Sequence, residues 1–214
     1  MTEKPNIVIR TASLKDKEQI KQHLRLNFYK DEPCCKSMGV LAEGQPLCEN
    51  LEDYFLLSFG NGLDLVAECD GKIVGVCLNV LMERGVEETP FVATSEKCIK
   101  IKEFLDYIFE EVNIFERYPD VNKAINLLIL SVEMKYRHLG IGTLLCKRTI
   151  ELAKTLEAKL IMVECTSIYS AAAVKSLGFQ LVWKSEFDKY KVNNEIVFKT
   201  TPPHNIVQTL IYKV

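Results

Sequence analysis

The most informative stretch of the sequence is an apolar run that leads into a bend containing two glycines. Residues 124–132 read as a buried strand, Arg137, Gly140 and Gly142 follow, and a helical pattern covers 140–156. Glycines at such a junction let a ligand approach the backbone. The first helical turn offers unpaired N–H groups and a positive dipole end. The combination favours binding of a pyrophosphate.

Known phosphate-binding motifs narrow the interpretation of this bend. A dinucleotide site of the G-x-G-x-x-G type lacks its third glycine here, and the Gly-Lys-Ser/Thr of a P-loop is absent. The pattern Arg-x-x-Gly-x-Gly over 137–142 resembles the acetyl-coenzyme A motif of the GNAT acetyltransferase superfamily. The alternative is a purely structural helix start, in which the glycines only form a tight turn.

The sequence downstream of the bend resembles the second half of a GNAT core. It contains a strand over 159–165, the serines Ser167 and Ser170, and Gly178-Phe179. The resemblance implies an α/β fold with one mixed sheet, splayed middle strands and flanking helices. Backbone groups of Leu130 and Val132 would hold the pantetheine arm in the gap. The implied acetyl-CoA contacts are Leu130, Ser131, Val132, Arg137, His138, Leu139, Gly140, Ile141, Gly142, Thr143, Ser167 and Lys175.

Three further stretches, 27–33, 165–170 and 195–204, resemble insect arylalkylamine N-acetyltransferases. This subgroup resemblance implies transfer of an acetyl group from acetyl-CoA to dopamine, serotonin, tyramine or octopamine. An alkylamine is mostly protonated at neutral pH, so a carboxylate is a suitable base for it. By resemblance, that base is Glu32 in Asp31-Glu32-Pro33. The alternative is that this tripeptide is only a charged helix end.

Two positions depart from the common GNAT pattern. Many members place a basic glutamate fourteen residues before the first glycine, and that position is Asn126, which cannot accept the proton. Glu133 lies nearby, and we interpret it as a surface or structural residue. Many members also carry a tyrosine general acid where this chain has Val174. Protonation of the leaving group therefore falls to another group.

Two hydroxyl residues are implied as assistants of catalysis by the insect enzymes: Thr166 and Ser170. Ser170 has an alternative role as N-cap of the next helix, and the two roles are compatible. For the acceptor pocket we predict Phe28, Tyr29 and His204, together with the polar segment after the first helix. Aromatic residues at helical spacing also suit a core, so Phe28 and Tyr29 keep that alternative.

The remaining elements predict one domain over residues 1–214. Strands are expected over 7–12, 63–69, 72–81, 124–132, 159–165, 179–185 and 206–213, and helices near 14–28, 48–59, 96–115, 140–156 and 171–177. Asp70-Gly71 is typical of a type I′ hairpin turn. Ser13 is the candidate N-cap of the first helix, which should end at Asp31-Glu32-Pro33 because a residue before proline disfavours α geometry. The order indicates one mixed sheet with helices on both faces.

Composition limits the other function classes. The net charge is −2 and no basic tract stands out, so nucleic acid is an unexpected partner. No signal peptide or membrane-length apolar run is visible. With irregular spacing of eight cysteines and only three histidines, we expect reduced cysteines and no metal site. The prediction is a cytoplasmic, monomeric enzyme, with polyamine acetylation, longer acyl donors or inactive coenzyme A binding as alternatives.

Overall fold

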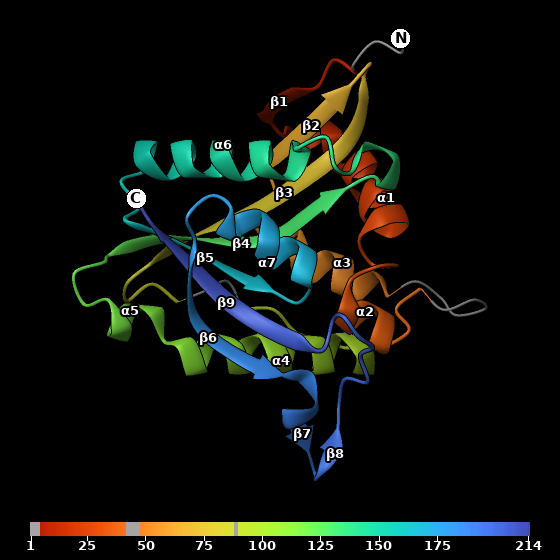
Figure 1. Ribbon diagram of the computed structural model, residues 1–214, viewed down its shortest axis with the longest axis vertical. Helices are drawn as coiled ribbons and strands as arrows, with labels where there is room; N and C mark the ends of the chain where they lie inside the picture. The colour runs from red at the N-terminus through yellow and green to blue at the C-terminus, as the bar shows by residue number, and fades with distance from the viewer. Residues whose placement is uncertain (1–4, 42–47, 88–89) are drawn as a thin grey trace.

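The computed structural model describes residues 5–41, 48–87 and 90–214. Within these ranges the chain forms a seven-stranded mixed sheet with strand order β1-β2-β3-β4-β5-β9-β6, and β7 and β8 form a separate hairpin (Figure 1). The strands are β1 (Val8–Thr11), β2 (Leu65–Cys69), β3 (Lys72–Glu83), β4 (Lys123–Val132), β5 (Leu160–Cys165), β6 (Gln180–Glu186), β7 (Lys191–Val192), β8 (Glu195–Ile196) and β9 (Ile206–Lys213). The mixed α/β class predicted from the sequence is confirmed.

Helices cover both faces of the sheet, as predicted, because the strands carry apolar side chains on both faces. One buried cluster joins α1, α3 and α4 to the sheet, and the other joins α6 and α7 to its opposite face (Figure 1). The helices are α1 (Lys17–Asn27), α2 (Pro33–Ser37), α3 (Glu49–Phe55), α4 (Glu96–Val112), α5 (Ile114–Arg117), α6 (Ile141–Thr155) and α7 (Ile168–Lys175). Short 3₁₀ turns occupy Leu14–Asp16, Met134–Tyr136 and Phe187–Lys189.

The two central parallel strands separate halfway along their length. β4 pairs with β5 only from Ala124 opposite Leu160 to Leu127 opposite Val163. A bulge follows in β4 at Leu128, because Leu78 and Asn79 of β3 face Ile129 and Leu127. Beyond it β4 stays paired with β3, while β5 stays paired with β9. The result is a fork between β4 and β5, which is the splay expected from the resemblance.

Several element boundaries differ from the sequence-based prediction. The first α-helix ends at Asn27, before the Asp31-Glu32-Pro33 segment that was expected to terminate it. Glu32 and Pro33 instead form the N-cap and the first residue of α2. Proline suits the first helical position because its missing N–H is not needed there. Helix α7 begins at Ile168, three residues before its expected start. Part of the polar segment expected after the first helix, residues 42–47, lies outside the described residues.

The expected β2–β3 hairpin is confirmed. The β2–β3 hairpin turns at Asp70 (φ 50°) and Gly71 (φ 77°), the left-handed pair that a type I′ turn requires. All eight cysteines are unpaired and buried. Across the three described ranges, no helix combines the length and apolar character needed to cross a membrane.

Candidate active site

The N-terminus of α6 presents backbone amides to the surroundings. Gly140 is its N-cap in the left-handed conformation (φ 79°), no side chain caps the helix, and its first turn carries no acidic residue. The N–H of Leu144 donates to the Gly140 carbonyl (3.0 Å) as the first ladder bond. The N–H groups of Ile141, Gly142 and Thr143 precede that ladder and point out of the helix end. This is the arrangement that binds an anion.

Gly142 faces the end of β4 at short range. A Cβ atom at this position would lie 3.7 Å from Leu130 Cδ2 and 3.9 Å from Val132 Cγ2. A longer side chain would therefore extend into the space between the helix end and the strand. The missing side chain keeps this space open, which fits a diphosphate and its pantetheine arm.

Every second residue of β4 points its backbone N–H and C=O groups toward the fork. The N–H of Glu133 donates to the Val74 carbonyl of β3 (2.9 Å). Because alternate residues of a strand point to opposite neighbours, Leu130 and Val132 turn their backbone groups away from β3, toward the fork. The Val132 carbonyl accepts a hydrogen bond from Arg137 Nε (3.1 Å). These positions agree with the predicted pantetheine contacts, and the binding role itself stays a prediction.

Arg137 connects the end of β4 to the segment that contains Glu32. Its Nη2 lies 2.7 Å from Asp31 Oδ2, across 106 positions of sequence. The guanidinium is therefore engaged by a carboxylate and a carbonyl of the protein, while His138 and Leu139 are exposed beside it. The ion pair brings the predicted base segment to the same strand end as the amides of α6.

Glu32 acts as the N-cap of α2. One carboxylate oxygen accepts from the Cys34 N–H (3.0 Å) and the other from the Cys35 N–H (2.6 Å). Burial, with the nearby Glu32 charge, raises the pKa of both cysteine thiols, so they stay protonated. Each carboxylate oxygen has two lone pairs. The half-buried Glu32 is thus held in one orientation and keeps a lone pair available for a proton.

The N-terminus of α7 is capped by Ser167. Its hydroxyl accepts from the Ser170 N–H (3.1 Å) and lies 3.0 Å from Ser170 Oγ. The suggestion that Ser170 is itself the N-cap is therefore wrong, because the helix starts three residues earlier. Ser170 Oγ donates to the Ser167 carbonyl (3.0 Å). Thr166 is partly exposed between β5 and α7.

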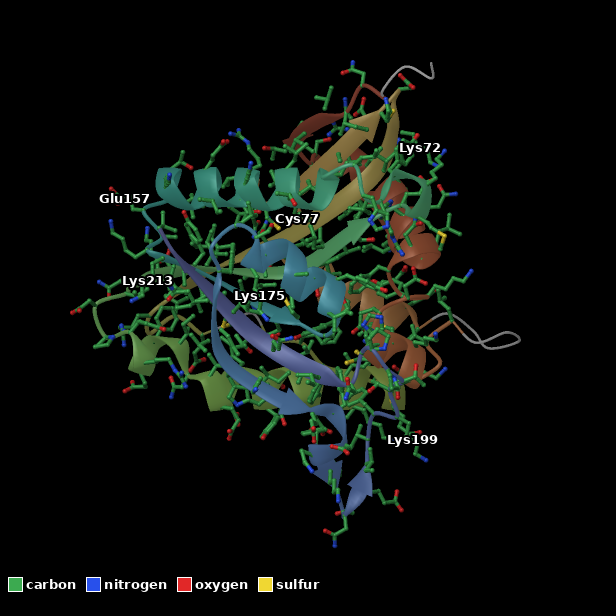
Figure 2. All side chains as sticks on the ribbon, in the orientation of Figure 1. Lys72, Cys77, Glu157, Lys175, Lys199 and Lys213 are labelled. Carbon is green, nitrogen blue, oxygen red and sulfur yellow. The ribbon has the colours of Figure 1, made fainter. Side chains whose placement is uncertain are left out.

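The two remaining predicted residues near α7 also have protein partners. His204 Nδ1 accepts from the Ile168 N–H (3.4 Å), and its ring lies 5.2 Å from the ring of Tyr169. His204 therefore lies at the N-terminus of α7. Lys175, labelled in Figure 2, donates to Gln208 Oε1 of β9 (2.6 Å). Its predicted contact with the adenosine phosphates would require that bond to break.

The predicted acceptor aromatics divide into one accessible and one buried residue. Tyr29 is 1% exposed, and burial raises the pKa of its hydroxyl. Its ring lies 5.5 Å from Phe28 and 6.3 Å from Phe55, in the core between α1 and α3. Phe28 is half-buried and can still meet a ligand. The core alternative therefore fits Tyr29 better than substrate contact.

His23 of α1 contacts β4, and the sequence analysis did not predict this role. His23 is 4% exposed, and its Nε2 lies 3.0 Å from Ser131 Oγ. Burial lowers the pKa of His23 to about 4, so it is neutral at pH 7. Its place beside Ile20 and Leu24 on the apolar side of α1 was the one available signal. Ser131 thus contacts His23 of α1. Glu133 forms an ion pair with Lys72 (2.8 Å), which is consistent with the structural role predicted for Glu133.

Comparisons with known proteins agree with this architecture. The crystal structure of arylalkylamine N-acetyltransferase 2 from Aedes aegypti has 27% identity, covers 97% of this chain and 99% of its own, and has a TM-score of 0.86. Mosquito arylalkylamine N-acetyltransferase like 5b has 24% identity, coverage of 98% and 100%, and a TM-score of 0.85. The Drosophila melanogaster polyamine N-acetyltransferase, which forms N-acetylagmatine, has 22% identity, coverage of 98% and 100%, and a TM-score of 0.83.

The mosquito 5b and Drosophila enzymes are less than 25% identical to this chain, so their similarity establishes the fold alone. Residues 25–179, well over half of the chain, match the family described as "Acetyltransferase (GNAT) family". The matched range includes the fork, the bend and the Glu32 segment. The chain therefore belongs to the GNAT family of acetyltransferases, whose members use acetyl-coenzyme A.

Proposed function

We propose that this acetyltransferase moves the acetyl group of acetyl-CoA to the primary amine of an arylalkylamine such as dopamine, serotonin, tyramine or octopamine. The observation that carries the proposal is a juxtaposition at the end of β4. The uncapped amides of α6 lie on one side, and Arg137 ties the Asp31–Pro33 segment to the same strand end. An anion site and a carboxylate base thus meet where the sheet forks.

The donor would bind along β4. The N–H groups of Ile141, Gly142 and Thr143 suit its diphosphate, and the fork-facing backbone of Leu130 and Val132 suits the amides of its pantetheine arm. The open space beside Gly142 supports this path. The thioester would then lie in the fork, where β5 no longer covers β4.

The amine would react from the face of the sheet that carries α1 and α2. Glu32 takes a proton from the ammonium, and the neutral nitrogen attacks the thioester carbonyl. A new C–N bond forms, and the tetrahedral intermediate collapses as the C–S bond breaks to release the coenzyme A thiolate. The nitrogen also loses its second surplus proton, which balances the proton that the thiolate takes up. Ser170 is placed to supply a proton to that thiolate if its hydroxyl turns away from the Ser167 carbonyl, and Thr166 lies beside it.

Two observations bear on the amine. The half-buried Phe28 and the similarity to a mosquito arylalkylamine enzyme support an aryl substrate. Similarity in fold to a polyamine N-acetyltransferase, at 22% identity and a TM-score of 0.83, favours a second candidate, a polyamine or agmatine. All residues that the mechanism uses come from a single chain, so we predict an active monomer.

A panel assay of thiol release tests the function. Purified protein with acetyl-CoA is offered tyramine, dopamine, serotonin, octopamine, agmatine and putrescine, and free thiol is measured for each. The proposal expects kcat/KM for the best arylalkylamine to exceed that for either aliphatic amine by at least tenfold. Faster turnover of agmatine or putrescine would favour the second candidate. Thiol release that no amine stimulates would contradict both.

A further inference from the structure

Two buried polar atoms near the fork have no hydrogen-bond partner among the described residues: Asn126 Oδ1 and Thr209 Oγ1. Asn126 is 8% exposed and Thr209 is 0% exposed. Buried polar side chains in folded proteins nearly always have a partner, and an exception calls for a specific explanation. A donor that is not part of the protein would explain both atoms.

The two residues lie on the same face of the sheet. On β4, Asn126 alternates with Leu127, whose side chain packs toward α6. On β9, Thr209 lies between Leu210 and Gln208, and Gln208 reaches Lys175 of α7. Because strand side chains alternate between faces, Asn126 and Thr209 point to the other side, which α1 and α4 cover.

Glu164 lies between them on β5. Its neighbours Val163 and Cys165 pack toward α6 and α7, so its side chain shares the face of Asn126 and Thr209. Thr209 is its direct partner in the β5–β9 ladder, and Asn126 faces Met162, two residues earlier on β5. Directly opposed side chains of an antiparallel pair, such as Glu164 and Thr209, start about 5 Å apart, and neighbouring strands of a sheet lie about 4.8 Å apart. The three side chains therefore surround one small region.

This region coincides with the opening of the fork. The last β4–β5 pair is Leu127 with Val163, and Glu164 is the next residue of β5. Glu164 is half-buried, whereas the two residues beside it are buried. It therefore forms the accessible member of the group. The face is also the one on which Cys34 and Cys35, the residues that bind Glu32, join the buried cluster.

The chemistry of the three groups selects a donor-rich cation. A carboxylate and an amide oxygen can only accept hydrogen bonds, and a threonine hydroxyl can accept as well as donate. A primary ammonium brings three N–H donors and one positive charge. It would satisfy both orphaned atoms and be attracted to the Glu164 carboxylate in a partly buried setting, where charge-assisted bonds are strong.

We propose that Glu164, Asn126 and Thr209 form an ammonium subsite, which binds the acceptor amine in its protonated form before Glu32 removes a proton. The subsite rests on the proposed function and deepens it, since it names the groups that recognise the nitrogen. The three residues bind the amine, and Glu32 remains the base. The subsite also favours primary over N-methylated amines, because each methyl group removes a donor.

The test uses the fastest amine of the panel and its alcohol analogue, which is tyrosol if the amine is tyramine. The variants are Glu164→Gln, Asn126→Leu, Thr209→Val and the conservative Thr209→Ser. For Glu164→Gln we expect KM for the amine to rise at least tenfold, with KM for acetyl-CoA within twofold. Inhibition by the uncharged alcohol should change less than twofold, since the alcohol carries no charge for Glu164 to recognise.

The other variants separate hydrogen bonding from packing. Thr209→Val should raise KM for the amine about threefold to tenfold, and Thr209→Ser should restore it because the hydroxyl returns. Asn126→Leu should raise it similarly. Glu111→Gln, an exposed carboxylate on α4, is the matched control and should change nothing. Thermal unfolding of each variant confirms that it is folded.

The outcomes distinguish this inference from the proposed function. If the wild-type protein acetylates an amine but Glu164→Gln leaves its KM unchanged, the ammonium subsite is wrong and the function stands. An equal loss of affinity for amine and alcohol would also overturn the subsite, because it would indicate a general packing defect. If no amine is acetylated by the wild-type protein, the function fails and the subsite with it.

Discussion

Two helix N-termini near the end of β4 solve the same electrostatic problem differently. At α2 the first amides, those of Cys34 and Cys35, receive the carboxylate of Glu32. At α6 the amides after Gly140 receive no side chain. Both helix ends attract negative charge. The N-terminus of α2 binds the carboxylate of Glu32, whereas the N-terminus of α6 is left open for an anionic group of the ligand.

The difference shows how one physical feature serves two halves of a reaction. The cap fixes the Glu32 carboxylate in one orientation, which a base needs, and the bare end of α6 suits a diphosphate. Helix α7 is intermediate, because its cap is the neutral hydroxyl of Ser167. A neutral cap leaves the helix dipole available to a thiolate formed nearby.

The largest effect is expected from Glu32→Gln. Glutamine keeps a carbonyl oxygen to cap α2 but cannot accept the proton of the amine. We expect kcat to fall by roughly 10²–10⁴, the usual contribution of a general base, while acetyl-CoA affinity stays within twofold. Steady-state kinetics and calorimetric titration measure the two quantities.

Glu133→Gln is the matched control, because Glu133 is another carboxylate at the same strand end and is held by Lys72. It should keep kcat within about threefold of wild type, as expected for a group with no part in proton transfer. Unchanged turnover of Glu32→Gln would remove Glu32 from the mechanism. The contrast between the two helix ends would then be structural only.

Gly142→Asp supplies α6 with an anion of its own. The side chain would point toward Leu130 and Val132 and occupy the space left for the ligand. We expect acetyl-CoA affinity to fall more than tenfold, while the thermal midpoint holds, because a negative charge stabilises a helix N-terminus. Gly142→Ala is the steric control, since its Cβ meets only ordinary contacts. Normal titration of Gly142→Asp would contradict the phosphate assignment.

Gly140→Ala tests the turn that presents the α6 amides. Gly140 has φ 79°, which an alanine adopts at a cost of about 1–2 kcal/mol. Nothing lies within 4 Å of the added Cβ, so the cost is conformational. Denaturant unfolding should show this loss in free energy of unfolding. A variant as stable as wild type would mean that the bend relaxes to another conformation.

The smallest effect is expected at the neutral cap of α7. Ser167→Ala removes the acceptor of the Ser170 N–H and should lower the free energy of unfolding by about 1 kcal/mol. Ser170→Ala keeps that cap and should cost less. The reverse order in denaturant unfolding would restore Ser170 as the more important residue for the helix start.

The sequence predicts features that depend on local signals. The bend, α6 and the β2–β3 hairpin follow from glycine positions and apolar patterns, and the fork follows from the family resemblance. The role of Asp31-Glu32-Pro33 was predicted wrongly, because a proline can either follow the end of one helix or occupy the first turn of the next. Which of these happens depends on whether the Cys34 and Cys35 amides find an acceptor.

Contacts between distant segments also escaped prediction. The Arg137–Asp31 ion pair spans 106 positions. The grouping of Asn126, Glu164 and Thr209 depends on how three strands align with one another, and apolar patterns in one sequence do not reveal which strands pair. Tyr29 fits an aromatic pocket by type, and only packing against α3 decides that it is buried.

A crystal structure with bound coenzyme A would show directly whether α6 binds the diphosphate. We expect the diphosphate oxygens about 2.7–3.2 Å from the backbone nitrogens of Ile141, Gly142 and Thr143, with the thiol end in the β4–β5 fork. A diphosphate bound at another surface, with the α6 amides contacted only by protein, would contradict the central claim.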